Sequence, residues 1–317
     1  MHYSKPIANL ILILLVGLIN GQTPIAPDRE KNSNQDEIRI QNLKSLSAGT
    51  INAKEADTTK PAVVLFFDDG FYAFYQYAYP LLKRHKMTAS LGLIASYIKN
   101  YKLKNNRTLN SFMTQNEVQE LIDSLAVEIA SHSVSHTRLI EIQDTMLIKY
   151  ELVVSKKILE SLFDQKVITF VYPYGKYDDQ IVRMTSEAGY LIGRTCDFGE
   201  PNFWIAPFKV PIKEVRDTMS VKHISDYIKK HDQTVLVFHK IVPKPKVFTE
   251  YSVSRFDSIL SILELLKVRI YTMRELYGNW RQEVLRKIIL ERGLLSSDNW
   301  DSLLFQQVDI DLTRTRP

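Results

Sequence analysis

From residue 60 onward, short apolar runs alternate with amphipathic helical patterns, and this alternation restricts the fold more than any other feature of the chain. The expected strands are 62–67, 88–94, 126–130, 167–172, 190–194, 205–210, 234–238 and 268–271. The expected helices are 74–86, 115–125, 145–163, 178–188, 220–231 and 255–266. Strands separated by helices pair in parallel and are covered by those helices. We therefore predict an α/β fold, a distorted and incomplete (β/α) TIM-like barrel.

The length of the chain fits one such domain with extensions at both ends. A chain of 317 residues with 45% apolar residues can bury a large core, and one α/β barrel reaches about 250 residues. We place the domain at residues 61–278 and expect a polar, flexible lead-in at 22–60. The extension at 279–317 contains a helical stretch. We expect it to pack on the outside of the barrel, because fewer than about 40 residues seldom fold alone.

The N-terminus has the pattern of a secretory signal peptide at residues 1–21. Lys5 precedes an apolar run from Ile7 to Ile19, and Gly21 offers a small residue for cleavage. The run is shorter than the roughly 20 residues of a membrane span, although an uncleaved anchor remains an alternative. The single cysteine, Cys196, is far from this segment, which disfavours a lipid anchor. We expect an exported protein that is secreted, periplasmic or at the cell surface.

The charge distribution disfavours nucleic acid as a partner. The formal net charge is +5, and basic residues are scattered among acidic ones, with the densest cluster at 99–107. We expect this cluster to be a solvated loop. The sequence does not indicate an oligomeric state.

Two short motifs bring together residues typical of a metal site. Asp68 and Asp69 follow an apolar strand and precede a glycine, at the strand end where parallel α/β folds place their chemistry. His132 and His136 follow the expected strand 126–130, which ends at the same rim. A spacing of four residues sets two imidazoles about 6 Å apart on one side of a helical turn. The alternative, an ordinary turn with a capping aspartate and surface histidines, requires two coincidences.

These motifs, in this order, resemble those of the polysaccharide deacetylases, the NodB-homology or carbohydrate esterase family 4 group. The resemblance covers roughly residues 60–278. It includes the family motifs (T/S)FDDG, H(S/T)xxH, RxPYG and LxH, which correspond here to Phe66–Gly70, His132–His136, Val171–Gly175 and Leu236–His239. The resemblance implies a catalytic base at Asp68, metal ligands at Asp69, His132 and His136, and further site residues at Pro173, Tyr174 and His239.

Two positions depart from the family pattern. Phe66 replaces the threonine of the first motif, and Val171 replaces the arginine of the third. Because that arginine is thought to orient the base in the wider family, Asp68 is left without its expected partner. The branch that acts on poly-β-1,6-N-acetylglucosamine often lacks this arginine, and the chain also resembles that branch at 127–132. A further family motif with Asp and Trp has Asp197 and Trp204 as candidates.

The chemistry follows from the residue types. A divalent ion with three protein ligands and an open position lowers the pKa of water to about 7. Asp68 would accept the proton, a backbone N–H near Tyr174 would stabilise the oxyanion, and His239 would protonate the leaving amine. The alternative for His239 is a core histidine at a strand end. Zinc is the favoured ion, with nickel, cobalt and iron(II) as alternatives. Tyr72, Pro173 and Trp204 are the expected substrate-binding residues.

Three functions are compatible with these features. The first is a secreted, metal-dependent N-deacetylase of N-acetylglucosamine polymers, with an acetylated amino-sugar polymer as partner. The second is a carbohydrate-binding relative that has lost turnover because Asp68 lacks support. The third is a hydrolase of other linear or cyclic C–N amide bonds. We favour the first, since a signal peptide points to a wall or matrix substrate.

Overall fold

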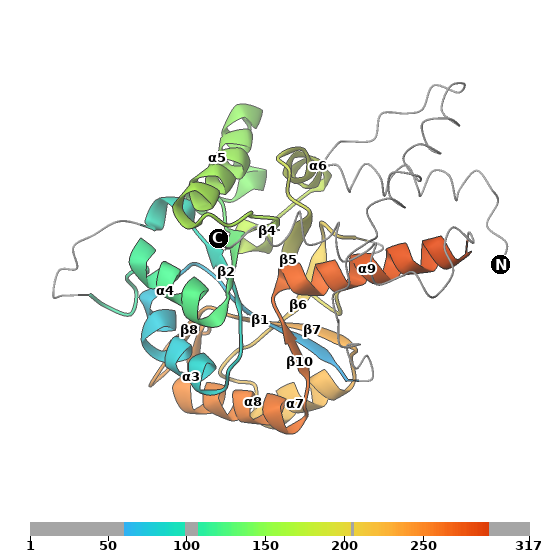
Figure 1. Ribbon diagram of the computed structural model, residues 1–317. Coiled ribbons are helices and arrows are strands. Elements are labelled where there is room, and N and C mark those ends of the chain that lie inside the picture. Colours follow the sequence, from blue (N-terminus) through green and yellow to red (C-terminus); the bar gives the residue numbers. More distant parts are fainter. Residues whose placement is uncertain (1–59, 99–106, 204–205, 292–317) are drawn as a thin grey trace. The chain divides into compact units, whose positions relative to one another are not determined.

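The computed structural model describes residues 60–98, 107–203 and 206–291 (Figure 1). All of them belong to one of the two units into which the chain divides, residues 51–317. Several segments lie outside the described residues: the expected signal peptide, the lead-in up to residue 59, most of the basic cluster, Trp204 and the residues after 291. Within the described ranges, no helix has the length and apolar character needed to cross a membrane.

Seven parallel strands close into a barrel. They are β1 (Ala62–Phe67), β2 (Ser90–Leu93), β3 (Glu128–Ser131), β4 (Thr169–Val171), β5 (Ile192–Phe198), β6 (Val210–Glu214) and β7 (Gln233–Phe238). β7 pairs with β1 over the whole of β1, which closes the ring. β10 (Arg269–Tyr271) pairs with the first half of β1, whereas β2 pairs only with its last two residues. β10 is thus a partial eighth strand, and the predicted distorted, incomplete barrel is confirmed.

Helices surround the strands on the outside (Figure 1). They are η1 (Phe74–Ala78), α3 (Tyr79–Arg84), α4 (Gln115–Leu125), α5 (Thr145–Phe163), α6 (Asp179–Glu187), α7 (Val221–Lys229) and α8 (Val253–Leu265). Short η2 (Ala95–Tyr97), η3 (Leu139–Glu141) and η4 (Pro173–Gly175) and strands β8 (Lys240–Val242) and β9 (Glu250–Ser252) lie in the connections. Several helices start at a polar cap; Thr114, for example, forms a capping box with Glu117 at the start of α4.

One expected strand is in the wrong place. The sequence predicted a strand at 205–210, but β6 begins only at Val210. Residues 206–209 form a turn, in which the Lys209 N–H donates to the Ala206 carbonyl at 3.0 Å. Pro207 within this segment has no N–H to donate to a neighbouring strand. The apolar character of the segment therefore reflects packing and not strand pairing.

The apolar residues of the strands form two layers. Val64 and Phe66 point into the barrel, while Val63, Leu65 and Phe67 pack against the outer helices. All six residues of β1 are buried, which explains why the strand reads as a continuous apolar run and not as an alternating one.

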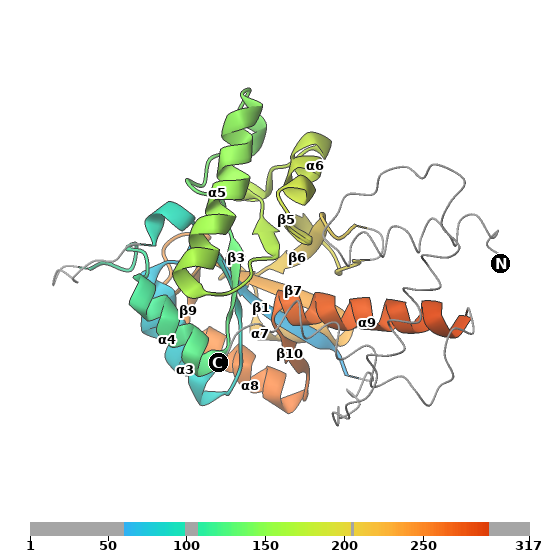
Figure 2. The same cartoon turned by 45° about the horizontal axis from the view of Figure 1, so that its top comes forward.

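Helix α9 (Met273–Glu291) closes the amino-terminal end of the barrel. It begins beside β1 and β10 (Figure 2), and its Met273, Leu276 and Tyr277 belong to the interior layer. The buried Glu128 carboxylate at the start of β3 accepts a hydrogen bond from the Arg274 N–H at 2.8 Å. The domain boundary expected at residue 278 falls inside this helix, whose first turns are part of the core.

Candidate metal centre and active site

The acidic pair extends β1 at its carboxyl end. The Asp68 N–H donates to the Phe238 carbonyl at 3.0 Å, which keeps Asp68 in the strand pairing, and its side chain is buried. Asp69 and Gly70 then adopt left-handed backbone angles, with φ of 71° and 79°. The chain turns sharply here, and a Cβ at position 70 would approach Leu93 to 2.9 Å. Asp68 and Asp69 consequently differ in direction and in environment.

The two histidines lie on an irregular loop between β3 and η3. The predicted helical turn is wrong, because Ser133 and His136 have φ of 65° and 63°. The loop folds back on itself, and the His136 N–H donates to Ser133 Oγ at 2.9 Å. A fold-back of this kind brings residues four apart together just as a helical turn does. Left-handed angles in residues other than glycine are strained and cluster at functional sites.

A buried carboxylate that the sequence did not reveal supports this loop. Glu151 on α5 accepts hydrogen bonds from the N–H groups of Val134 and Ser135, at 2.8 and 2.9 Å, and from Ser135 Oγ. The available signal was an acidic residue on the apolar face of an expected helix, next to Ile148 and Leu152. A carboxylate on a buried face requires partners, and here these are the backbone of the histidine loop.

Three donor atoms converge at the rim. His132 Nε2 and His136 Nε2 are 3.1 Å apart, and Asp69 Oδ1 lies 3.5 and 3.6 Å from them. A tetrahedral ion about 2.0 to 2.1 Å from each donor sets the donors about 3.3 Å apart, and an octahedral ion sets them about 3.0 Å apart. The triangle therefore fits a divalent first-row metal, in either geometry.

The protonation states of these groups also suit a cation. Burial lowers the pKa of His132 to about 3, so the ring is neutral, and burial lowers the pKa of His136 as well. The His132 Nδ1–H donates to the Val171 carbonyl at 2.9 Å, which leaves the Nε2 lone pair free for a metal. Burial and the charge of Asp68 raise the pKa of Asp69 to about 6. A divalent ion would relieve this crowding of negative charge.

Arg194 supplies Asp68 with the partner that the sequence comparison found missing. The guanidinium group is completely buried on β5, and its Nη2 donates to Asp68 Oδ1. Burial acts to raise the pKa of Asp68, but the charge of Arg194 and its hydrogen bond oppose this rise, and the pKa lies below its ordinary value. Asp68 is thus an ionised, oriented carboxylate.

The two departures from the family motifs surround this arginine. Val171 on β4 and Arg194 on β5 are register partners, so the arginine stands one strand away from its expected position. The Phe66 ring lies 4.9 Å from the guanidinium carbon. A Cβ at Gly92 would meet Asp68, Phe66 and Val171 at 3.2 to 3.3 Å, so glycine leaves room for this group. An isolated arginine in an apolar strand was the available signal, since arginine is seldom fully buried without a partner.

His239 and Tyr174 complete the centre. His239 follows β7, and its Nε2 lies 3.8 Å from Asp68 Oδ2. Tyr174 has φ of 57°, and its ring lies 4.5 Å from the His136 ring, with about half of its surface exposed (53%). Among the residues that the structure describes, the Tyr174 N–H has no hydrogen-bond acceptor. This amide is thus available as a donor beside the candidate metal ligands.

The remaining predicted residues have other surroundings. Pro173 is buried in the turn before Tyr174. Tyr72 donates to Gln76 and stacks against Arg107, whose guanidinium carbon lies 3.7 Å from the ring centre. Asp197 is exposed and accepts a hydrogen bond from Tyr177. Trp204 lies outside the described residues.

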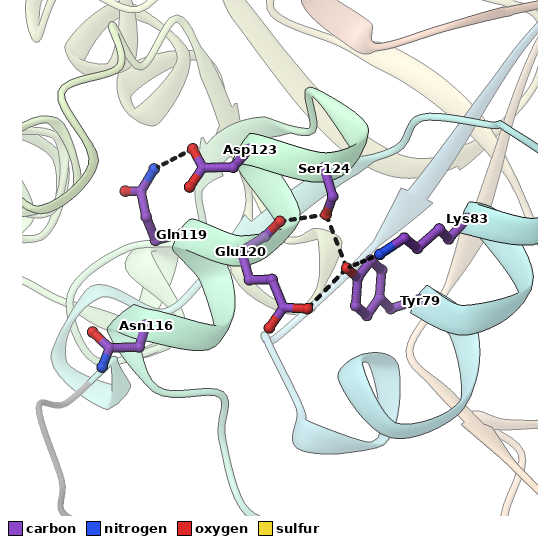
Figure 3. A pocket seen from close by; sticks show the side chains of 7 residues that line it. All are labelled: Tyr79, Lys83, Asn116, Gln119, Glu120, Asp123 and Ser124. Carbon is purple, nitrogen blue, oxygen red and sulfur yellow. Dashed lines mark hydrogen bonds between the residues drawn. The ribbon is translucent and has the colours of Figure 1, made fainter.

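A separate hollow of about 400 Å³ lies between α3 and α4 (Figure 3). Tyr79 Oη donates to Glu120 Oε1 at 2.9 Å, Ser124 Oγ is 2.9 Å from the same hydroxyl, and Lys83 donates to it. The polar groups that line this hollow mainly form hydrogen bonds with one another. None of them belongs to the cluster of Asp69, His132 and His136. We assign no chemistry to this hollow.

Comparison with known proteins identifies the domain. The sequence model of the polysaccharide deacetylase family matches residues 55–193, which contain the acidic pair, the histidine loop and the Tyr174 turn. The chain carries a polysaccharide deacetylase domain. YxkH of Bacillus subtilis, named as a member of this class, is 24% identical over 199 residues, which are 62% of this chain and 67% of that protein.

A second relative and a solved structure are also similar. The poly-β-1,6-N-acetyl-D-glucosamine N-deacetylase of Staphylococcus aureus is 25% identical over 177 residues, which cover 51% of this chain and 59% of that protein. The chain thus spans about three fifths of that relative's length. The Streptococcus pyogenes deacetylase PplD is 20% identical, with a TM-score of 0.47, and the match covers 72% of this chain and 93% of PplD.

Proposed function

We propose that this deacetylase domain is a metal-dependent hydrolase that removes N-acetyl groups from a polysaccharide containing N-acetylglucosamine. The observation that carries the proposal is the ionised Asp68, held by the buried Arg194, beside the donor triangle of Asp69, His132 and His136. A base next to a three-ligand metal site is the arrangement that amide hydrolysis requires.

Each residue of the centre has a defined task in this reaction. A bound divalent ion would supply an acidified water and polarise the acetyl carbonyl. Asp68 accepts the proton of the attacking water, since its carboxylate is ionised and fixed by Arg194. The Tyr174 N–H donates to the oxygen on which negative charge develops. His239, 3.8 Å from Asp68, delivers a proton to the leaving amine.

The arrangement favours catalysis over the binding-only alternative. That alternative was motivated by Val171, because a valine cannot orient the Asp68 carboxylate. Arg194 makes the contact from the neighbouring strand, so the reason for expecting an impaired base no longer applies. Hydrolysis of other C–N amide bonds would use the same centre. Tests with different substrates distinguish this activity from N-deacetylation of a polysaccharide.

We propose that the substrate is poly-β-1,6-N-acetylglucosamine and that the product is the same polymer, partially deacetylated. We propose that the reaction takes place outside the cell, after export. The Staphylococcus aureus relative is named for this substrate, and the sequences at 127–132 and 171–175 resemble that branch. Deacetylation leaves amines that are largely protonated at neutral pH, which would turn a neutral polymer into a polycation that adheres to anionic cell surfaces. The expected signal peptide supports export.

Acetate release from defined oligomers tests the proposal. Protein loaded with zinc, cobalt, nickel or iron(II) is compared on β-1,6-linked and β-1,4-linked N-acetylglucosamine oligomers of equal length, with Asp68→Asn as the control. We expect release that requires both the metal and Asp68 and that is faster on the β-1,6 series. Faster release from the β-1,4 series would reject the polymer assignment alone. A metal-loaded protein that releases acetate from neither series would reject the deacetylase proposal.

A further inference from the structure

An aromatic ledge stands beside the metal centre. Phe71 follows Asp69 by two residues and forms an antiparallel bridge with Phe112, and the two rings stack at 5.1 Å. The Tyr97 ring lies 4.4 Å from Phe112 and is partly exposed. In this ledge, defined as Phe71, Phe112 and Tyr97, the rings largely cover one another, and Tyr97, which is 38% exposed, offers an aromatic surface of the kind on which sugars pack.

Hydrogen bonds fix the ledge to the strand end that carries Asp69. The Tyr72 N–H donates to the Ser111 carbonyl at 2.7 Å, and the Met113 N–H donates to the Gly70 carbonyl at 2.9 Å. The ledge is therefore part of the rigid rim, and a polymer whose acetyl group reaches the metal centre extends past it with the neighbouring sugar.

Lys240 places a positive charge on this ledge. It follows His239 directly, and its Nζ lies 4.2 Å from the centre of the Phe71 ring. The ammonium donates to Asn110 Oδ1 at 2.6 Å, which holds it in place. Its charge acts on Asp69, where it opposes the rise in the pKa of that carboxyl group. Lys240 thus follows the proposed acid in the chain and lies within electrostatic reach of the proposed metal ligand Asp69.

This charge has no carboxylate partner among the described residues. Three arginines in loops at the same rim do have one: Arg107 pairs with Glu117, Arg138 with Glu141 and Arg216 with Glu214. A divalent ion would balance the charges of Asp68 and Asp69, so Arg194 and Lys240 would leave the loaded centre with two uncompensated positive charges. These positive charges would repel a cationic group of the substrate beside the reacting sugar.

We propose that Lys240 excludes a free ammonium group from the sugar next to the one being deacetylated. The inference rests on the proposed deacetylase function and adds a rule for its pattern. An N-acetylated neighbour is neutral and packs on the ledge, whereas a glucosamine neighbour is protonated and repelled by Lys240. Deacetylation then slows next to a unit that has already reacted, and the polymer acquires spaced amines instead of blocks.

Tetramers of defined pattern test this rule. The fully N-acetylated tetramer is compared with two tetramers that carry one glucosamine on either side of the reacting unit, in the linkage from which more acetate is released. We expect wild-type kcat/KM to be at least about fivefold lower for one of the two, as for a pair of like charges roughly 6 to 8 Å apart that solvent largely screens. The ratio should shrink in 0.5 M salt.

Variants at position 240 identify the source of the discrimination. Lys240→Gln keeps a donor for Asn110 but removes the charge, and it should bring the ratio close to one. Lys240→Arg should keep the ratio, and it controls for damage to the ledge. Lys222→Gln on α7 changes the net charge equally at a highly exposed site and should leave the ratio unchanged. An equal ratio in wild type and Lys240→Gln would overturn the proposal.

A binding measurement separates this rule from the proposed function. Dissociation constants for the same tetramers are measured in the Asp68→Asn background, with and without Lys240→Gln. A preference for the acetylated tetramer that Lys240→Gln removes supports charge selection, even if no variant releases acetate, in which case only the deacetylase proposal fails. Equal binding of all tetramers together with undiminished turnover of the amine-bearing ones would refute charge selection and leave the deacetylase proposal intact.

Discussion

Replacing Arg194 by methionine should cost both stability and catalysis. The guanidinium group is completely buried and Asp68 is only 3% exposed, so the substitution leaves a buried carboxylate without its partner. Breaking a buried pair from one side typically costs about 3 to 5 kcal/mol of unfolding free energy. Without its fixed donor, Asp68 should also act poorly as a base. A lost acid–base group reduces turnover by roughly 10²- to 10⁴-fold.

A second substitution distinguishes orientation of Asp68 from general packing. Val171 is the register partner of Arg194, and its side chain lies beside Asp68 across Gly92. The double variant Arg194→Met/Val171→Arg therefore returns the arginine to the position usual in the family. We expect it to recover at least about tenfold in acetate release over Arg194→Met, an effect that a purely structural role would not produce.

Three measurements assess this pair of variants. Urea denaturation gives the loss of unfolding free energy, acetate release gives the loss of turnover, and elemental analysis should show that Arg194→Met still binds the metal, since no ligand is changed. Arg84→Met, which removes an exposed pair with Asp257, should cost at most about 1 kcal/mol. Turnover of Arg194→Met within a few-fold of wild type would refute the orienting role, as would a double variant with no recovery despite a stable fold.

Further predictions concern the centre and its support. Alanine at any one of the three proposed metal ligands should abolish stoichiometric metal in elemental analysis; single variants that still carry a full equivalent would place the metal elsewhere. Asp68→Asn and His239→Ala should retain the metal and lose roughly 10²- to 10⁴-fold in acetate release, and a loss of only a few-fold would reject the role of that residue. Glu151→Ala should leave the buried N–H of Val134 and the partly buried N–H of Ser135 unsatisfied and cost about 2 to 4 kcal/mol, with weaker metal binding by competition against a chelator. Glu151→Gln, which retains an acceptor oxygen, should be milder, and equal effects of the two would argue against this support.

The barrel could be predicted from the sequence because its signal is repeated. Each strand and helix has its own apolar period, so one misplaced strand at 205–210 did not change the fold class. The convergence of Asp69 with His132 and His136 followed from motif order and from the rule that parallel strands end at one rim. The local backbone did not follow, since a spacing of four fits both a helical turn and the strained loop that the structure shows.

Arg194 shows what local patterns cannot provide. Its contact with Asp68 depends on the register between β4 and β5 and on the closure of the barrel that brings β1 near β5. The two residues are 126 positions apart, and no motif connects them. The supporting role of Glu151 could not be predicted for a similar reason. Its partners are backbone groups of a loop whose shape the sequence did not define.

The register pairing of Val171 with Arg194 affects how inactive relatives should be recognised. Side chains in register on neighbouring parallel strands project in the same direction at the same height, so either position can present an arginine to the same carboxylate. A motif read along one strand misses this exchange. Loss of the arginine from the third motif is therefore evidence of lost catalysis only when the paired residue on the next strand is also unable to reach the base.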